Sequence, residues 1–86
     1  MGKYKITFKF SVSRDLLEIP NQDVAKILTK IEKLSENPKI QGSIKLTGKE
    51  LYRVRQGNYR ILYEIVDAQL EIIIIRIAHR AKIYNF

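Results

Sequence analysis

The sequence contains no cysteine and a single histidine, and these two scarcities exclude most metal and thiol chemistry. Without cysteine the chain forms neither a disulfide framework nor a reactive thiolate. One histidine among scattered carboxylates does not give the ligand spacing of a zinc site. We therefore expect no metal ion and no cofactor.

Long apolar runs are also missing. No stretch of about 18 apolar residues occurs, so a membrane span is not expected. The first ten residues, MGKYKITFKF, alternate charged and apolar side chains where a secretory signal has an unbroken apolar block. We expect a cytoplasmic protein without a membrane partner.

Positive charge is what the chain has in excess. Its 86 residues suit one compact domain, residues 1–86, and carry 16 Lys and Arg against nine Asp and Glu, a net charge of +7. Such a balance indicates a polyanion or an acidic protein as partner. The excess is concentrated between residues 39 and 63, where Glu50 is the single acid. The basic residues there are Lys39, Lys45, Lys49, Arg53, Arg55 and Arg60.

The first half of the chain has the pattern of one strand and two helices. Residues 3–10 alternate apolar and polar side chains, which predicts a half-buried strand. Residues 11–20 predict a short helix with Leu16, Leu17 and Ile19 turned inward. Apolar residues at helical spacing then predict a second helix over residues 21–36, which must lie on a sheet.

The second half has the pattern of a three-stranded meander. Residues 51–56 and 59–66 are strand-like runs joined by Gly57-Asn58, a recognised two-residue hairpin turn. Residues 70–78 follow a second turn, and their four successive isoleucines predict a central strand buried on both faces. Residues 39–49 are polar and predict a connection. We therefore expect an α+β fold with two N-terminal helices packed on one face of a small, mostly antiparallel four-stranded sheet.

Three arginines meet in the predicted hairpin. Arg53 and Arg55 leave the same face of their strand, and a two-residue turn places Arg55 opposite Arg60. Like charges directly opposed on a sheet are destabilising, and a bound polyanion would remove that cost. The plainer interpretation is a solvated face on which arginine stems cover apolar surface.

A second polar group follows the last predicted strand, in the stretch AHRAKIYNF. Arg80 suits bidentate contact with a phosphate, and the ring of Tyr84 suits stacking on a base. Phosphate chemistry on RNA would also need a base for the 2′-hydroxyl and an acid for the leaving oxygen. Arginine is a poor base because it is not deprotonated in proteins. His79 titrates in the right range, although a lone histidine is more often an ordinary surface residue.

The stretch LYRVRQGNYRILYEIVDAQLEIIIIRIAHRAKIY, residues 51–84, resembles the RelE toxins of the RelE/ParE superfamily. The features that carry the resemblance are a basic strand, a G-x-Y-R turn, a Y-E-I-x-D second turn and a closing H-R-x-x-x-Y. The resemblance implies a ribosome-dependent endoribonuclease that cuts mRNA in the A site of the 30S subunit and leaves a 2′,3′-cyclic phosphate. It also implies inhibition by a cognate RelB-like antitoxin and leaves a toxin-antitoxin complex of higher order open.

The resemblance also implies roles for individual residues. Arg53 and Arg60 would stabilise transition-state charge, Arg80 would act near the leaving oxygen as acid or charge donor, and Tyr84 would orient or stack the base. Further basic residues are expected to contact RNA outside the reacting centre. These are Lys45 and Lys49.

Two departures from the family pattern bear on these roles. Arg55 stands where the family pattern has a lysine that is proposed as general base. His79 could replace it as base, but neighbouring strand residues point to opposite faces, so His79 would face away unless the strand bends. The chain also stops two residues past Tyr84, so a family helix after that point is not expected.

Two other functions remain open from the sequence. A ParE-like inhibitor of DNA gyrase would share the fold, but that branch generally lacks this set of arginines and tyrosine. A RelE-type fold with weakened catalysis could act as a binding or regulatory partner, which would fit Arg55.

Overall fold

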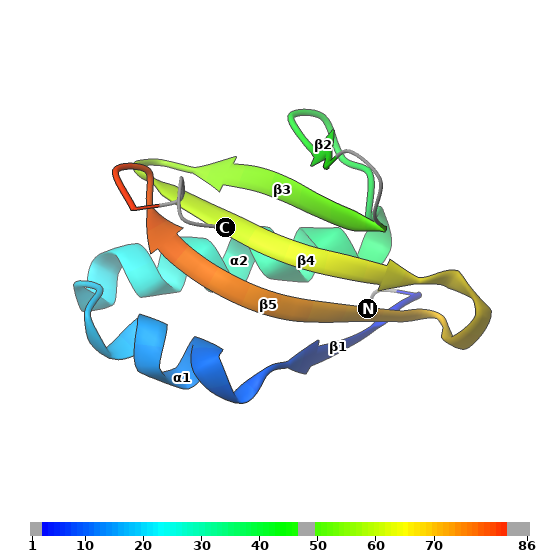
Figure 1. Ribbon diagram of the computed structural model, residues 1–86, viewed down its shortest axis with the longest axis horizontal. Helices are drawn as coiled ribbons and strands as arrows, with labels where there is room; N and C mark the ends of the chain where they lie inside the picture. Colours follow the sequence, from blue (N-terminus) through cyan, green and yellow to red (C-terminus); the bar gives the residue numbers. More distant parts are fainter. Residues whose placement is uncertain (1–2, 47–49, 83–86) are drawn as a thin grey trace.

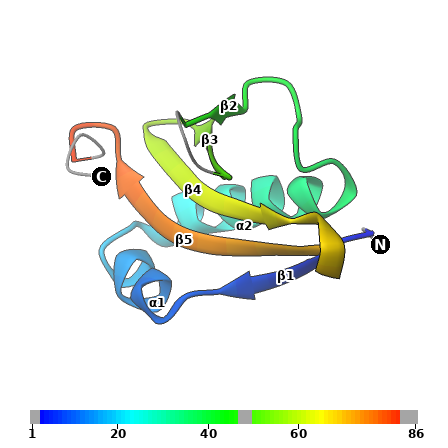
Figure 2. The same ribbon diagram turned by 45° about the vertical axis from the view of Figure 1, so that its right-hand side comes forward.

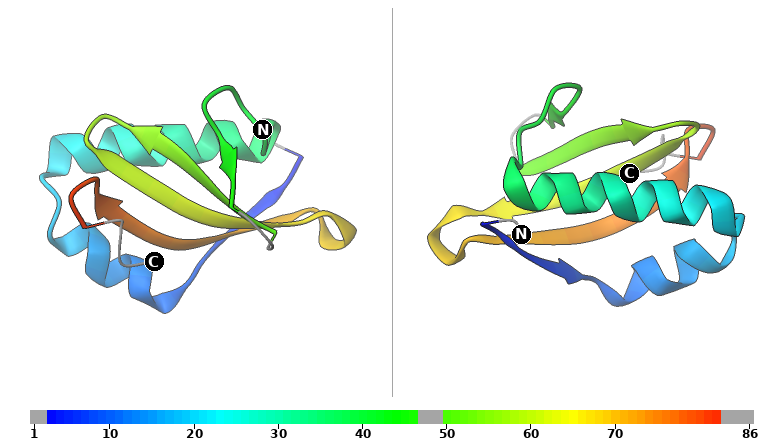
Figure 3. Two further views of the ribbon diagram at one scale, coloured as in Figure 1. Left: turned by 45° about the horizontal axis from the view of Figure 1, so that its top comes forward. Right: turned by 180° about the vertical axis from the view of Figure 1, so that it is seen from behind.

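The computed structural model describes residues 3–46 and 50–82 of the chain, which form two helices and a five-stranded sheet. The strand order is β1-β5-β4-β3-β2, and β1 runs parallel to β5 while the other neighbours are antiparallel. Both helices lie on one side of the sheet (Figures 1 and 3). The elements are β1 (Lys5–Phe8), α1 (Phe10–Leu17), α2 (Asn21–Glu36), β2 (Ile44–Lys45), β3 (Leu51–Gln56), β4 (Tyr59–Val66), the 3-10 turn η1 (Asp67–Gln69) and β5 (Glu71–His79).

The predicted α+β architecture is confirmed, but the prediction of four strands is wrong. The fifth strand is β2, in which Ile44 pairs with Arg53 and Lys45 pairs with Tyr52. Two residues are too few to show an alternating pattern, so this segment had the appearance of a connection in the sequence. It forms a short arm beside β3 (Figure 2).

The isoleucine-rich segment forms an interior strand, β5, but it lies one position from the sheet edge and the central strand is β4. β5 lies between β1 and β4, and Ile72 and Ile74 are fully buried beneath the helices. Ile73 and Ile75 on the opposite side are partly buried. The rest of the core comes from both helices and the neighbouring strands. It includes Val12, Ile27, Ile31, Leu34, Tyr52, Val54, Ile61, Tyr63, Ile65 and Ile77.

One inward residue of the first helix was predicted wrongly. Leu17 is 86% exposed, whereas Val12 is buried and Leu16 packs against the core. Each residue turns a helix by about 100°, so the face that passes through Val12 and Leu16 cannot also contain Leu17. In the described part of the chain, neither helix is long and apolar enough to cross a membrane.

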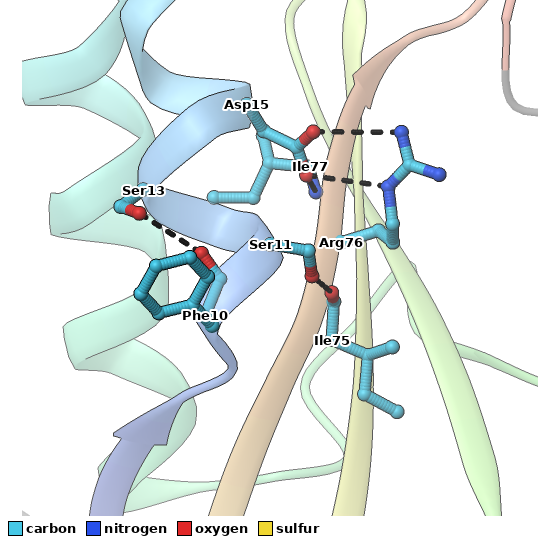
Figure 4. Close-up of polar contacts among 7 residues, drawn as sticks. All are labelled: Phe10, Ser11, Ser13, Asp15, Ile75, Arg76 and Ile77. Carbon is cyan, nitrogen blue, oxygen red and sulfur yellow. Dashed lines mark hydrogen bonds and ion pairs between the residues drawn. The ribbon is translucent and has the colours of Figure 1, made fainter.

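Helix α1 completes the hydrogen bonding of β5 beyond the point where β1 ends. Just past the end of β1, the Lys9 N–H donates to the Ile74 carbonyl at 2.9 Å. Farther along, Ser11 Oγ donates to the Ile75 carbonyl and Asp15 Oδ2 accepts the Ile77 N–H, each at 2.9 Å (Figure 4). Side chains of α1 therefore satisfy backbone groups that would otherwise be left at a strand edge.

Asp15 also pairs with a charge on the same strand. Its carboxylate lies 3.3 Å from Arg76 Nε, and Arg76 Nη2 is 3.4 Å from Asp15 Oδ1. The β4–β5 pairing shifts register between Leu62 and Tyr63, so β5 carries an irregularity in this region. Asp15 therefore contacts β5 just after the register shift in its pairing with β4.

A buried tyrosine connects β4 to the segment after α2. Tyr63 is fully buried, and its hydroxyl donates to the Pro38 carbonyl at 2.6 Å. Its ring stacks on Tyr52, with 5.8 Å between the ring centroids. Burial raises the pKa of Tyr63 to about 12, because the phenolate would lose its hydration.

We predict that Asp15→Ala lowers the free energy of unfolding by about 1–3 kcal/mol, since the Ile77 N–H loses its acceptor. Asp15→Asn keeps an oxygen acceptor and should cost less. Arg76→Gln removes the exposed ion pair and should cost less than about 1 kcal/mol. Urea unfolding of the three variants tests this order, and an Asp15→Ala variant as stable as the wild type would contradict the assignment.

The raised pKa of Tyr63 predicts a loss of stability in alkali. The pKa of Tyr63 is near 10.0 in the unfolded chain and about 12 in the folded protein. The contribution of neutral Tyr63 to the free energy of unfolding is therefore complete below pH 10 and is lost as the pH rises from 10 to 12. Tyr63→Phe removes the hydrogen bond to Pro38 and should lower the free energy of unfolding by about 1 kcal/mol at pH 8. Between pH 10 and 12 the stability of the variant should fall less than that of the wild type. Urea midpoints across this range measure both effects. An unchanged alkaline decline in the variant would show that Tyr63 does not cause it.

Candidate functional site

Three arginines of the β3–β4 hairpin lie on the sheet face opposite the helices. The pairing of β3 and β4 places Arg55 directly opposite Arg60 and Arg53 opposite Leu62, as the two-residue turn predicted. The alternate residues of the same strands, such as Val54 and Ile61, are buried under the helices. Period-two alternation therefore turns the arginines outward on one face.

The turn that sets this register is Gly57-Asn58, as predicted. Gly57 has a φ of +61°, a conformation that glycine adopts without steric cost, and nothing lies within 4 Å of where its Cβ would be. A positive φ at the first turn residue is the pattern of a type II′ hairpin turn, whose twist matches that of the strands. The backbone of Gly57 thus fixes which residues of the two strands face each other.

The arginines line a groove of about 570 Å³ at the β3 edge of the sheet. We call this the arginine groove. Arg55 is exposed, whereas Arg53 and Arg60 are partly buried, and Arg60 Nη1 lies 3.5 Å from its neighbour's carbonyl, Tyr59 O. Its lining residues are Lys30, Gln41, Gly42, Ile44, Arg53, Arg55, Gln56, Gly57 and Arg60.

The chemistry of the arginine groove is that of an anion site. Four of its lining side chains are cations, and none of the described lining residues is Asp, Glu or His. Arg53 and Arg55 make no hydrogen bond or ion pair with the residues at 3–46 and 50–82, so their guanidinium groups are available to a ligand. The planar donors of arginine match the oxygens of a phosphate. No cluster of His, Asp or Glu among the described residues could hold a metal ion.

Arg80 lies beside the hairpin turn and outside the set of groove-lining residues. It follows the last residue of β5, is exposed, and its backbone N–H donates to the Asn58 carbonyl at 2.7 Å. Asn58 adjoins Gly57, which lines the groove. The fold therefore brings the start of the C-terminal segment to one end of the groove, as the adjacent loops in Figure 1 show.

His79 lies on the other side of the sheet from the arginines. It pairs with Tyr59, and the two rings meet edge to face at 5.6 Å between centroids. Both residues line cavities on the helical side, one of about 320 Å³ and one of about 200 Å³. His79 Nδ1 accepts the Ala81 N–H at 3.1 Å. The structure therefore does not bring His79 together with the three hairpin arginines.

Of the remaining predicted residues, Lys45 is described by the structure and is not among the residues that line the arginine groove. Lys45 pairs with Tyr52 in the sheet, and its Nζ lies 3.5 Å from Glu50 Oε1. Lys49 and Tyr84 lie outside the described residues.

Several groove-lining residues were not predicted as site residues, among them Lys30 of α2 and Gln41 of the following loop. The helical periodicity accounted for the apolar side of α2 and gave no role to its polar side. A signal was present in the spacing of Lys26, Lys30 and Lys33, which places three lysines on one face of the helix.

Comparisons with known proteins agree with the fold and the order of these elements. The family model described as ParE toxin of type II toxin-antitoxin system, parDE, matches residues 6–84. The toxin RelG of Mycobacterium tuberculosis is 34% identical over 86 residues, which cover 95% of this chain and 97% of that protein. The toxin in the RelBE2 toxin-antitoxin complex of M. tuberculosis matches with a TM-score of 0.80 and 28% identity, over 91% of this chain and 99% of that one. A RelB-RelE complex of Methanococcus jannaschii gives a TM-score of 0.74 and 31% identity, over 92% and 95% of the two chains.

The position of Arg55 opposite Arg60 predicts that this pair of charges lowers the stability of the free protein. Arg55→Gln should raise the free energy of unfolding by about 0.2–1 kcal/mol at low salt, because it removes the like charge opposite Arg60. The gain should shrink at high salt, where exposed charges are screened. Arg53→Gln is the matched control, since it lies on the same strand face but opposite Leu62. Urea unfolding at two salt concentrations measures both, and equal effects of the two substitutions would refute the pairwise explanation.

Proposed function

Since this chain belongs to the RelE/ParE superfamily of type II toxin-antitoxin toxins, we propose that it is a ribosome-dependent endoribonuclease that cleaves mRNA. The observation that carries the proposal is the convergence of Arg53, Arg55 and Arg60 on one groove, none of whose described lining residues is Asp or Glu. Sequence identity of 34% to the toxin RelG, over nearly the whole chain, supports the RelE branch of the superfamily.

The proposed reaction is a transfer within the RNA itself. The 2′-oxygen bonds to the adjacent phosphorus, the bond from phosphorus to the 5′-oxygen breaks, and the products are a 2′,3′-cyclic phosphate and a 5′-hydroxyl. The proton of the 2′-hydroxyl is lost, and the 5′-oxygen gains one. Negative charge grows on the phosphate oxygens in the transition state, which is where Arg53 and Arg60 would act. Removing one such donor typically costs about 10²–10³ in rate.

Neither Arg55 nor His79 is suited to remove the proton of the 2′-hydroxyl. Arg55 keeps its proton at any physiological pH. His79 is on the face with Tyr59 and the helices, away from the arginine groove. We therefore attribute catalysis by this chain to charge stabilisation and alignment of the reacting atoms, with the proton passing to solvent or to a group of the ribosome.

Two residues near the C-terminus receive roles next to the groove. Arg80 would place positive charge near the leaving 5′-oxygen, supported by its backbone bond to the turn at Asn58. Tyr84 would stack on or orient a base, a role that rests on the family resemblance. Lys45 and Lys49 would contact RNA outside the reacting centre, and Lys45 would first have to leave Glu50.

The proposed protein partner is a RelB-like antitoxin that inhibits the toxin in the cytoplasm. Several solved structures of this fold are complexes of RelE with RelB, including the one from Pyrococcus horikoshii. The net charge of +7 and the arginine groove would favour an acidic segment of such a partner. Ribosome and mRNA complete the proposed set of partners.

A ParE-like gyrase inhibitor is the second candidate, because the matching family model carries the ParE description. That function does not require phosphate-stabilising arginines. A supercoiling assay with purified gyrase separates the two candidates: inhibition by this protein, without mRNA cleavage, would select the ParE-like function.

We predict codon-associated cleavage when the protein is added to an in vitro translation reaction read by primer extension. Arg60→Ala and Arg80→Ala should each lower the cleavage rate by about 10²–10³. His79→Gln should lower it by less than about tenfold, because the imidazole does not face the arginine groove. Arg14→Ala removes an exposed arginine of α1 and serves as the matched control.

Cleavage at the wild-type rate in Arg80→Ala would refute the site assignment. A loss in His79→Gln as large as that in Arg60→Ala would make histidine the base and contradict the attribution to charge stabilisation alone.

A further inference from the structure

A second basic surface lies on the outer side of α2. Lys26, Lys30 and Lys33 follow the i, i+4, i+7 spacing, so they form a stripe along one face that is about 10 Å long. Lys26 and Lys33 are exposed and Lys30 is half-buried. A hollow of about 260 Å³ lies among these lysines, with Ala25, Thr29 and Gln56 as its other walls.

The three lysines make no ion pair with a described carboxylate, although Asp23 and Lys26 line the same cavity. In the ranges 3–46 and 50–82, the ion pairs involve Lys45 and Arg76 only, so none of the three lysines is paired with a carboxylate. Like charges three and four residues apart destabilise a helix. An anion bound along the stripe would remove that repulsion.

The stripe is continuous with the arginine groove around one edge of the sheet. Lys30 and Gln56 line both the hollow on α2 and the groove that holds Arg53, Arg55 and Arg60. β2 pairs with β3 only at Arg53 and Tyr52, so the last residues of β3 border this passage without a neighbouring described strand. Positive charge therefore runs from the open face of the sheet over its edge to the helix.

We propose that the lysine stripe of α2 binds the phosphodiester backbone of the same RNA strand whose reacting phosphate lies in the arginine groove. This assignment rests on the proposed function for the identity of the strand in the groove. Lysine ammonium groups contact phosphates as point charges and do not read bases, so the stripe adds affinity without sequence preference. The other two α2 residues that line the hollow, Ala25 and Thr29, offer little apolar surface for a folded protein helix, which favours RNA over an antitoxin helix as occupant.

The test compares two RNA lengths and two triple variants. The RNAs are a 2′-O-methylated strand of about 20 nucleotides, which can reach both surfaces, and one of about six, which occupies one of them. The methyl groups block attack by the 2′-oxygen, so binding is measured without cleavage. One variant carries Lys26→Gln, Lys30→Gln and Lys33→Gln. The control carries Lys3→Gln, Lys5→Gln and Lys9→Gln, which removes the same charge from exposed positions at the β1 edge, across the sheet from β3.

The stripe variant should bind the longer RNA roughly tenfold more weakly at fixed salt, with the loss equal for unrelated sequences. Its slope of log affinity against log salt should fall by about 2, since each phosphate contact on a single strand contributes about 0.7. Binding of the short RNA to the stripe variant should change much less, and so should binding of either RNA to the control variant. Circular dichroism confirms that both variants remain folded.

Equal losses in the two variants would show that only net charge matters and would overturn the proposal. Unchanged binding of the longer RNA would also overturn it, and loss of antitoxin binding in its place would assign the stripe to the protein partner. The result is separable from the proposed nuclease activity. A wild-type protein that fails to cleave in the translation reaction, but whose stripe variant loses the longer RNA, would leave the stripe as an RNA-binding surface.

Discussion

The register of the β3–β4 hairpin is the constraint on which the candidate site depends. Gly57 adopts a φ of +61° in a two-residue turn, and this aligns Val54 with Ile61 on the buried face and Arg55 with Arg60 on the open face. A slip of one residue would exchange the faces and bury guanidinium groups under the helices. Turn geometry and burial of the apolar residues favour the same register, so the groove follows from the folding of the core.

The cost of this arrangement is electrostatic repulsion in the free protein. Arg55 faces Arg60 across the hairpin, and the lysine stripe of α2 continues the positive charge beyond the sheet edge. Glu50, the acid that precedes β3, lies 3.5 Å from Lys45 and is not among the residues that line the groove. Phosphates of RNA and carboxylates of an antitoxin both relieve repulsion of this kind, so on this account the two partners compete for one surface.

The sequence predicted the hairpin, the isoleucine-rich strand and the second helix, because each has a long apolar pattern or a recognised turn. The short strand β2 was not, since Ile44 and Lys45 pair through backbone bonds that leave no pattern in two residues. The position of Leu17 depended on where α1 begins, which its sequence left open within a residue or two. In the site, strand alternation predicted the shared face of Arg53 and Arg55. Lys30 was missed because it joins the groove through a contact between elements distant in the chain.

The central claim is that the arginine groove, at the β3 edge of the sheet, holds the RNA phosphate. Nitrogen-edited NMR of the arginine Nε–H groups tests it directly during titration with a short 2′-O-methylated RNA. The account predicts shifts for Arg53, Arg55 and Arg60, while Arg14 on α1 and Arg76 beside Asp15 remain unchanged and serve as internal references. Shifts confined to the backbone around His79 and Tyr59 would place the RNA on the helical side and contradict the account.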